Sequence, residues 1–249
     1  MSDIKISIIT ATYNAAAHLP RLIESLLAQT DQDFEWVVAD GGSADGTLDL
    51  LEQVKSKFKR LIVDSRPDFG IYDALNRAIK LAEGDYYVVL GADDFFFPNA
   101  VADYKKHCQT RRHDLVSAQI NVNGKIIKHR RPRWLWLYGP PAVISGHAVG
   151  LAIRCSLHEK LGYYDRNYKI YGDGSFLLKC LYSGASVLNA EFVAGEFSTA
   201  GVSNAKHLAS FVEQFVAQVS CGRSIVIQNV LMLLRILRWR RQIVCNLKK

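Results

Sequence analysis

The chain has 249 residues, of which 49% are hydrophobic and 22% are charged, which is enough for one large domain or for one domain with an appendage. This composition excludes a generally disordered protein, because it supplies enough apolar side chains for a core. The five cysteines are scattered and form no Cys-x-x-Cys pair, so we expect neither a disulfide framework nor a zinc site. The same pattern predicts a reducing compartment.

The net charge of +7 is concentrated at the end of the chain. No acidic residue follows Glu213, and the basic residues beyond it account for the whole excess: Arg223, Arg235, Arg238, Arg240, Arg241, Lys248 and Lys249. Residues 1–213 are therefore balanced, which argues against general binding of polyanions, and no nucleic-acid-binding motif is present. A negatively charged partner is expected at the tail.

Residues 1–97 alternate between two patterns. Apolar, β-branched runs indicate strands, and apolar side chains at helical spacing indicate helices between them: strands at 4–9, 34–39, 61–63 and 86–90, and helices at 19–27, 48–54 and 72–82. Strands that alternate with helices predict a Rossmann-like α/β fold, with a mainly parallel sheet flanked by helices. In such a sheet the carboxyl ends of the strands form a ligand-binding edge.

The order of elements changes after Pro98. We expect a helix there, then a hairpin of strands 116–122 and 125–128 around Asn123-Gly124, and a basic, aromatic loop at 129–136. A strand at 148–153 and helices near 157 and 176 follow, then strand-like segments near 187 and 192. The chain ends in two helices, at 207–219 and 225–244, which Gly222 separates.

The fourth strand runs directly into two carboxylates, Asp93 and Asp94. They are expected just past the strand end, because an unpaired buried charge costs several kcal/mol or more. Adjacent oxygen donors suit Mg²⁺ or Mn²⁺, and these ions commonly bind phosphate groups as well. Capping of the helix near Pro98 is the alternative role for either aspartate.

Polar residues also end the earlier strands. Tyr13 could stack on a nucleobase, and Asp40 could accept an N–H group of a pyrimidine. Asp73 and Asn76 share a helix face that could support the Asp93-Asp94 loop or contact a nucleotide. The segment 40–47 matches neither the dinucleotide fingerprint nor a phosphate-binding P-loop.

The ordered series of motifs resembles the family 2 glycosyltransferases of the GT-A fold, above all bacterial enzymes that build capsule, exopolysaccharide or O-antigen chains. The resemblance covers about residues 4–200. Its motifs in the first half are Ile6-Ser7-Ile8-Ile9, Thr12-Tyr13-Asn14, Asp40-Gly41-Gly42-Ser43, Asp45-Gly46-Thr47, Pro67-Asp68, Gly70 to Asn76, and Gly84-Asp85 leading to Asp93-Asp94. The resemblance implies an inverting enzyme that uses a nucleotide sugar, commonly a UDP-sugar, together with Mg²⁺ or Mn²⁺.

Carried over by position, the resemblance assigns a role to each candidate site residue. Asp94 is the expected metal ligand, with Asp93 beside it; Gly91 departs from the polar or acidic residue found in many relatives. Asp173, which opens a helix, is the expected general base, and His147 lies on the acceptor side. The expected donor-binding residues are Thr10, Ala11, Thr12, Tyr13, Asp40, Asp68, Asp73, Asn76 and Asp93.

Two other functions are alternatives. A sugar-nucleotidyltransferase should carry a basic, glycine-rich loop after the first strand, and residues 10–17 contain neither glycine nor Lys or Arg. A non-catalytic module that binds a nucleotide sugar or glycan is the other, with Gly91 as its only indication. The favoured function is transfer of a sugar to a hydroxyl of a glycan or lipid-linked acceptor in surface polysaccharide synthesis.

The last helix combines apolar and basic residues. A helical wheel puts Met232, Ile236, Trp239, Ile243 and Leu247 on one side and the arginines Arg235, Arg238 and Arg241 towards the other. Such a helix is typical of binding to an anionic membrane surface, and packing on protein is the alternative. A lipid-linked acceptor favours the membrane.

We therefore expect a catalytic domain at 1–200 and a helical extension at 201–249. Residues 1–97 form the nucleotide-sugar-binding half of the domain and residues 98–200 the acceptor half. No secretory signal is recognised and no apolar stretch approaches the ~20 residues that span a bilayer. The expected location is cytoplasmic, at the inner face of a membrane, and the sequence indicates no oligomeric state.

Overall fold

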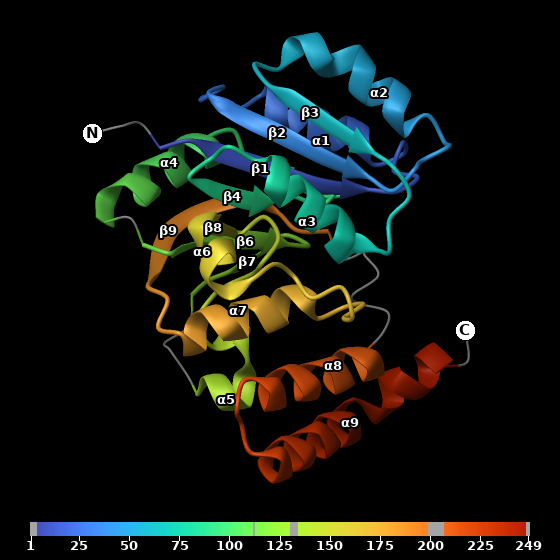
Figure 1. The fold of residues 1–249 in the computed structure, drawn as a ribbon, viewed down its shortest axis with the longest axis vertical. Coiled ribbons are helices and arrows are strands. Elements are labelled where there is room, and N and C mark those ends of the chain that lie inside the picture. The colour runs from blue at the N-terminus through green and yellow to red at the C-terminus, as the bar shows by residue number, and fades with distance from the viewer. Residues whose placement is uncertain (1–3, 112, 130–133, 199–206, 248–249) are drawn as a thin grey trace.

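The computed structural model describes residues 4–111, 113–129, 134–198 and 207–247, and a curled nine-stranded sheet runs through them. Its order is β3–β2–β1–β4–β8–β6–β9–β5, with β7 paired to β6. The first four strands are parallel, as the alternating pattern predicts: β1 (Ile6–Thr12), β2 (Phe34–Asp40), β3 (Leu61–Ser65) and β4 (Tyr86–Val89) (Figure 1).

Three helices connect these strands and cover both faces of the sheet: α1 (Leu19–Leu27), α2 (Thr47–Val54) and α3 (Ile71–Leu81), with a 3₁₀ turn, η1 (Lys55–Lys57), after α2. Each face carries a separate apolar core. Leu22 and Leu26 of α1 belong to one core, and Leu75 and Ile79 of α3 belong to the other. The structure confirms the predicted α/β fold.

The second half of the sheet is mixed. Its elements are β5 (Phe95–Phe96), α4 (Ala100–Arg111), β6 (Leu115–Val122), β7 (Lys125–Ile127), α5 (Leu135–Tyr138), η2 (Pro140–Ala142), β8 (Leu151–Arg154), α6 (Ser156–Leu161), α7 (Gly172–Tyr182) and β9 (Val187–Glu196). Strand β8 is antiparallel to β4 and β6, whereas β9 is parallel to β6. The expected hairpin is present, with φ of 50° at Asn123 and 78° at Gly124. The two expected segments near 187 and 192 are one strand, and β5 was not expected.

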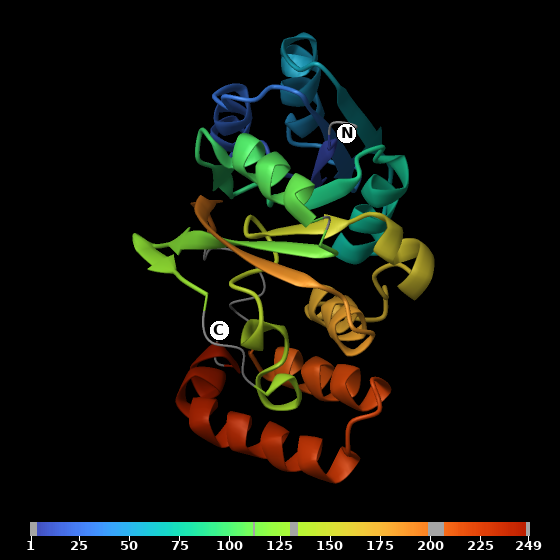
Figure 2. The ribbon, with the colours of Figure 1, turned by 90° about the vertical axis from the view of Figure 1, so that its left-hand side faces the viewer.

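The chain ends in an antiparallel pair of helices, α8 (His207–Ser220) and α9 (Ile225–Leu247), joined at Gly222 with φ of 78°. Figures 1 and 2 place this hairpin at the end of the molecule opposite α2, with α9 outermost. The expected domain boundary at residue 200 and residues 130–133 of the basic loop lie outside the described residues. Within the described part of the chain, no helix has the length and apolar character needed to cross a bilayer.

The orientation of α9 differs from the predicted wheel. Polar side chains of the hairpin face inward and donate to carbonyls of the short helix α5: Gln218 to Leu135 (3.1 Å), Gln228 to Trp136 (2.9 Å) and Arg235 to Leu137 (2.6 Å). The last carbonyls of a helix have no partner within it, so Gln228 and Arg235 supply donors to the carbonyls of Trp136 and Leu137; the carbonyl of Leu135 also accepts the backbone N–H of Gly139 (2.8 Å).

The wheel separates Arg235 from Met232, Ile236 and Trp239, whereas the structure places all four on one side of α9. Met232, Ile236 and Trp239 are half-buried on the same inner side, while Val230, Leu233 and Leu237 are exposed. The side chains of Arg241, Ile243 and Leu247 lie outside the described residues.

Candidate active site

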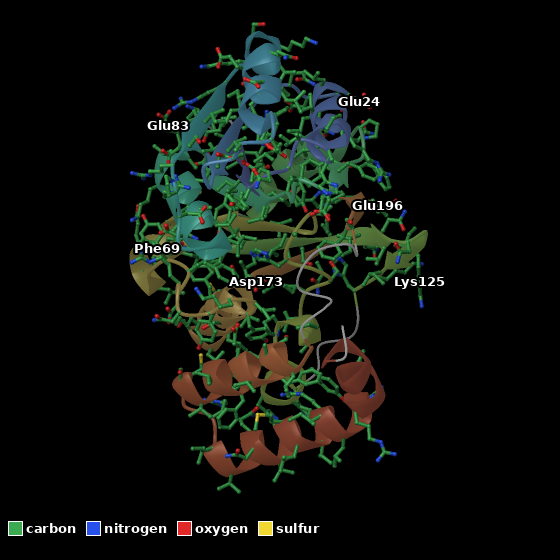
Figure 3. All side chains as sticks on the ribbon, turned by 90° about the vertical axis from the view of Figure 1, so that its right-hand side faces the viewer. Glu24, Phe69, Glu83, Lys125, Asp173 and Glu196 are labelled. Carbon is green, nitrogen blue, oxygen red and sulfur yellow. The ribbon has the colours of Figure 1, made fainter. Side chains whose placement is uncertain are left out.

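The predicted motifs lie on one side of the molecule. The carboxyl ends of β1, β2 and β3 and the start of α7 all face the right-hand side of Figure 1. Figure 3 views that side directly and shows Asp173 between the sheet and the C-terminal helices. A bound ligand could therefore contact the strand ends and Asp173 together.

The carboxylate of Asp40 organises the donor side of this region. It is fully buried and accepts hydrogen bonds from the hydroxyls of Thr12 (2.9 Å), Ser43 (2.5 Å) and Ser65 (2.8 Å), and from the backbone N–H of Gly42 (2.9 Å) and Ser43 (2.8 Å). Burial alone would raise the pKa of Asp40, but these hydrogen bonds hold the pKa below its ordinary value. Asp40 therefore ties three strand ends together as an anion.

Five donors already surround the Asp40 carboxylate, which gives it a supporting role in the structure, and its contact with a base stays a prediction. The same holds for Thr10, which is fully buried because β1 continues to Thr12; its hydroxyl accepts from the indole N–H of Trp36 (3.0 Å). The Thr12 hydroxyl donates to Asp40, and Ala11 is half-buried.

Tyr13, Gly41 and Asp68 form the surface in front of Asp40. The Tyr13 side chain is 68% exposed. A methyl group at Gly41 would lie 2.8 Å from Asp68 Oδ2 and 3.2 Å from the Tyr13 ring, so glycine lets both groups approach the backbone. An exposed ring beside a carboxylate acceptor is the arrangement that a nucleobase requires, for stacking and for an N–H group respectively.

Helix α3 supports this surface from behind. Arg77 is buried and donates to the Asp64 carboxylate (2.8 Å) and to the backbone carbonyl of Asp40 (3.0 Å), and it lies 3.6 Å from Asp68. Arg77 was not among the predicted site residues. Its position among the apolar residues of α3 was the available signal, because a buried cation needs anionic partners.

Asp73 and Asn76 connect α3 to the segment that precedes α7. Asn76 exchanges two hydrogen bonds with the backbone of Tyr164 (2.8 and 3.0 Å), and Asp73 accepts from Arg166 (3.0 Å). Burial opposes ionisation of Asp73, but Arg166 lowers its pKa. These two residues hold α3 against the segment around Tyr164 and Arg166.

Asp93 and Asp94 converge over Gly91. Asp94 is buried, and its two oxygens accept from the backbone N–H of Gly91 (3.0 Å) and Ser198 (2.8 Å). Burial raises the pKa of Asp94 to about 6, and Asp93 adds to the shift. A methyl group at Gly91 would lie 2.7 Å from Asp94 Oδ2 and 3.1 Å from Asp93 Oδ1. Glycine at this position therefore makes room for the two carboxylates.

This pair suits a divalent cation that is bound together with a diphosphate. Each Asp94 oxygen keeps a lone pair beyond its backbone hydrogen bond, and Asp93 is half-buried beside it. Mg²⁺ in such sites is commonly held by one or two carboxylates plus phosphate oxygens. No group of three metal-ligating side chains occurs among the residues that the structure describes.

Asp173 lies in the first turn of α7 with its side chain 30% exposed. Its Oδ2 is 3.4 Å from His147 Nδ1, and its Oδ1 is 3.0 Å from the hydroxyl of Tyr72. The neighbouring Gly172 lets the Tyr72 ring pack against the α7 backbone, where a methyl group would lie only 2.8 Å from the ring. A carboxylate in this setting has the access and the partners that a general base needs.

A buried hydrogen-bond chain runs away from His147. His147 Nε2 lies 3.0 Å from the Tyr164 hydroxyl, which lies 2.8 Å from the Tyr87 hydroxyl; that group is 2.7 Å from His158 Nε2. His158 Nδ1 is 3.0 Å from the carbonyl of Gly162. Burial lowers the pKa of His158 to about 4, so at pH 7 its ring carries one proton, which the carbonyl requires on Nδ1.

The directions of the other bonds follow from that proton. Tyr87 must donate to His158, Tyr164 to Tyr87, and His147 Nε2–H to Tyr164. Burial also lowers the pKa of His147, partly opposed by Asp173, so this imidazole is neutral at pH 7. Its Nδ1 then faces Asp173 without a proton, as an acceptor.

Glu213 of α8 positions the segment that leads to Asp173. Its carboxylate accepts from the backbone N–H of Lys169 (3.0 Å), Ile170 (2.9 Å) and Tyr171 (2.7 Å). These N–H groups directly precede α7. In the sequence Glu213 stands out only as the last acid of the chain, and no local pattern connects it to a loop forty residues earlier.

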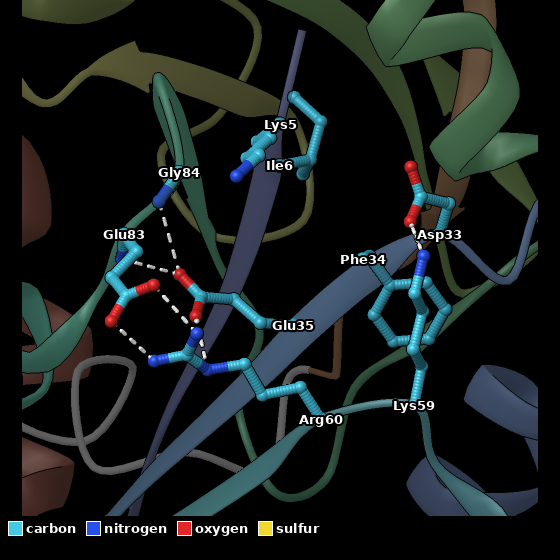
Figure 4. A pocket seen from close by; sticks show the side chains of 9 residues that line it. All are labelled: Lys5, Ile6, Asp33, Phe34, Glu35, Lys59, Arg60, Glu83 and Gly84. Carbon is cyan, nitrogen blue, oxygen red and sulfur yellow. Dashed lines mark hydrogen bonds and ion pairs between the residues drawn. The ribbon is translucent and has the colours of Figure 1, made fainter. Parts of the chain in front are cut away.

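A pocket of about 240 Å³ lies on the opposite edge, at the amino ends of β1, β2 and β4 (Figure 4). Arg60 pairs there with Glu35 (3.2 Å) and Glu83 (2.6 Å), and Glu35 accepts the N–H of Gly84 (3.0 Å). The charges that meet in this pocket neutralise one another, which is the arrangement of a structural ion-pair network.

Known proteins share this fold. The chain is 28% identical to the "PGL/p-HBAD biosynthesis glycosyltransferase" of Mycobacterium bovis (strain BCG / Pasteur 1173P2) over 254 residues, which is 95% of this chain and 97% of the relative. S. aureus TarS 1-349 in complex with UDP-GlcNAc superposes with a TM-score of 0.68 at 19% identity, covering 98% of this chain and 79% of that chain. The mannosyltransferase PcManGT of Pyrobaculum calidifontis, solved with GDP-Man and Mn²⁺, gives 0.63 at 18% identity, covering 95% and 75%.

The fold is GT-A, and the protein is a glycosyltransferase that takes its sugar from a nucleotide-sugar donor. More particularly, the chain belongs to glycosyl transferase family 2, whose model matches residues 7–175. The expected family and enzyme class are confirmed, and the two alternative functions are set aside.

Replacing Gly91 by alanine should weaken the carboxylate pair. The added methyl group must displace Asp94 or Asp93, so Mn²⁺ should raise the melting temperature less in the presence of UDP, and transfer should fall about tenfold or more. Gly124→Ala at the hairpin tip is the matched control. Equal metal response in the Gly91→Ala and wild-type proteins would contradict this function of Gly91.

Acidification should destabilise the protein partly through His158. Its pKa is near 4 when folded and about 6.5 when unfolded, so the unfolded state binds more protons as the pH falls from 6.5 to 4. The loss should be on the order of 2 kcal/mol between pH 7 and 4.5. His158→Gln keeps a donor and an acceptor but does not titrate, so urea unfolding should show a smaller loss in this variant; an unchanged loss would contradict the assignment.

Proposed function

We propose that the protein is an inverting glycosyltransferase that moves a sugar from a UDP-sugar to a hydroxyl of a glycan or lipid-linked acceptor in surface polysaccharide synthesis. The observation that carries this proposal is the position of Asp173, whose Oδ2 lies 3.4 Å from His147 Nδ1 on the side where β1 and β2 end. The complex of TarS 1-349 with UDP-GlcNAc supports the choice of donor, and the name of the mycobacterial relative supports a biosynthetic acceptor.

The donor is expected to lie along the strand ends. The base stacks on Tyr13 and donates an N–H group to Asp68, and Arg77 keeps Asp68 in place from behind. Asp93 and Asp94 would hold Mg²⁺ or Mn²⁺, which supplies positive charge against the departing diphosphate. Asp40, Thr10 and Thr12 keep this surface rigid.

Inversion requires attack from the face opposite the leaving group. The acceptor oxygen forms a bond to the anomeric carbon as the bond from that carbon to the diphosphate oxygen breaks, and the electron pair leaves with the diphosphate. Asp173 takes the hydroxyl proton as general base. The Asp173 carboxyl group then donates to His147 Nδ1, the acceptor that the buried chain leaves open.

Asp173→Asn should abolish transfer and leave donor binding intact. The amide cannot accept the hydroxyl proton, so we expect a loss of about a thousandfold or more in kcat. UDP with Mn²⁺ should still raise the melting temperature as in the wild type. Asp165→Asn, at a half-buried turn position, is the control. Transfer at the wild-type rate by Asp173→Asn would refute the base assignment, and a wild type that UDP and Mn²⁺ together do not stabilise would refute the donor.

His147→Gln should lower kcat about ten- to a hundredfold without changing KM for the donor, because glutamine cannot take up a proton. Between pH 5 and 8, kcat should change with pH differently in His147→Gln and in the wild type. His158→Gln, which preserves the far end of the chain, should keep kcat near the wild-type value. Equal pH profiles for His147→Gln and the wild type would leave His147 with no part in proton transfer.

A further inference from the structure

We propose that the outward face of α9 docks on the surface of an anionic lipid bilayer. This inference is independent of the transfer reaction. It rests on the orientation of α9, which turns Gln228 and Arg235 towards the protein and leaves a set of apolar side chains exposed to solvent. We call this solvent-facing set the α9 face; it comprises Val226, Ile227, Val230, Leu233, Leu234 and Leu237, between 48% and 68% exposed.

The α9 face is continuous along the helix. Val226, Val230, Leu233 and Leu237 follow one another at intervals of four, three and four residues, which places them on one stripe. An exposed apolar surface of this extent is rare on monomeric proteins and marks a site of interaction. Figures 1 and 2 both show α9 as the outermost element at its end of the molecule, so nothing described covers this face.

The charges around this face identify the partner. Arg240 follows Leu237 by three residues and Arg238 follows Leu234 by four, so each arginine lies one turn beyond a residue of the α9 face. Both arginines are exposed. Arg223, exposed just before α9, contributes a third cation, 4.5 Å above the Tyr182 ring. The only carboxylate of α8 and α9, Glu213, is bound to backbone N–H groups of the loop before α7.

An apolar stripe with a cationic end matches an anionic bilayer surface. The side chains of the stripe enter the boundary between headgroups and acyl chains, and arginines bind the headgroup phosphates. The neighbouring helix α5 adds exposed Trp136 and, just before it, Trp134, whose rings stack at 5.9 Å; tryptophan is enriched at membrane interfaces.

A second copy of the chain fits the same face less well. A twofold dimer buries identical patches against each other, so Arg238 and Arg240 of both copies would meet across the interface. No carboxylate of α8 or α9 is free to offset that repulsion.

The test is co-flotation of the full chain with vesicles. Wild-type protein should float with vesicles of phosphatidylcholine and phosphatidylglycerol and not with phosphatidylcholine alone. A double variant, Leu233→Glu with Leu237→Glu, should reduce the bound fraction at least tenfold. Ile126→Glu, a comparably exposed residue on β7, is the matched control and should float as the wild type does.

The arginines give a second, independent arm. Arg238→Gln with Arg240→Gln should weaken binding to the anionic vesicles and reduce its sensitivity to salt. Circular dichroism and thermal unfolding confirm that each variant is folded, and light scattering reports its oligomeric state. Failure of the folded wild type to float, or equal flotation of the Leu233→Glu, Leu237→Glu variant, would overturn the proposal. So would a wild-type dimer that the same variant dissociates in the absence of lipid.

Discussion

The buried carboxylate of Asp40 holds together the part of the sheet on which the donor surface depends. Five hydrogen bonds from three strand ends converge on two oxygen atoms, and each would be costly to leave unmade in the interior. Because the anion is satisfied from within, the backbone around Gly41 is fixed before any ligand arrives. Tyr13 and Asp68 are thus presented on a prearranged surface, and little ordering remains for the donor to impose.

Much of this architecture could be predicted from the sequence, because it depends on local periodicity. The alternation of apolar runs with helical spacing predicts the parallel strands, and Asn123-Gly124 predicts its hairpin. The roles of Asp40 and Thr10 could not be predicted in the same way. Whether a polar residue at a strand end faces a ligand or the interior depends on where the strand stops, and β1 runs three residues further than its apolar pattern.

The orientation of α9 shows the same limit on a larger scale. A helical wheel sorts residues by their own polarity, whereas Gln228 and Arg235 face inward because carbonyls of α5 need donors. The carbonyls of α5, about ninety residues earlier in the chain, therefore determine which side of α9 is exposed to solvent, because they accept hydrogen bonds from its inner side. Gly91 is a related case. It leaves space for the carboxylates of Asp93 and Asp94, and this role could not be predicted from the identity of the residue alone.

Glu213 bears on where the catalytic unit ends. The glutamate belongs to the C-terminal hairpin, yet its hydrogen bonds fix the backbone immediately before Asp173. A chain cut near residue 200 would keep Asp173 and the strand ends but would lose the hydrogen bonds that fix the backbone before Asp173. The hairpin is thus an integral support of this segment, and a force applied to α8 from outside would be transmitted directly to the loop that leads to Asp173.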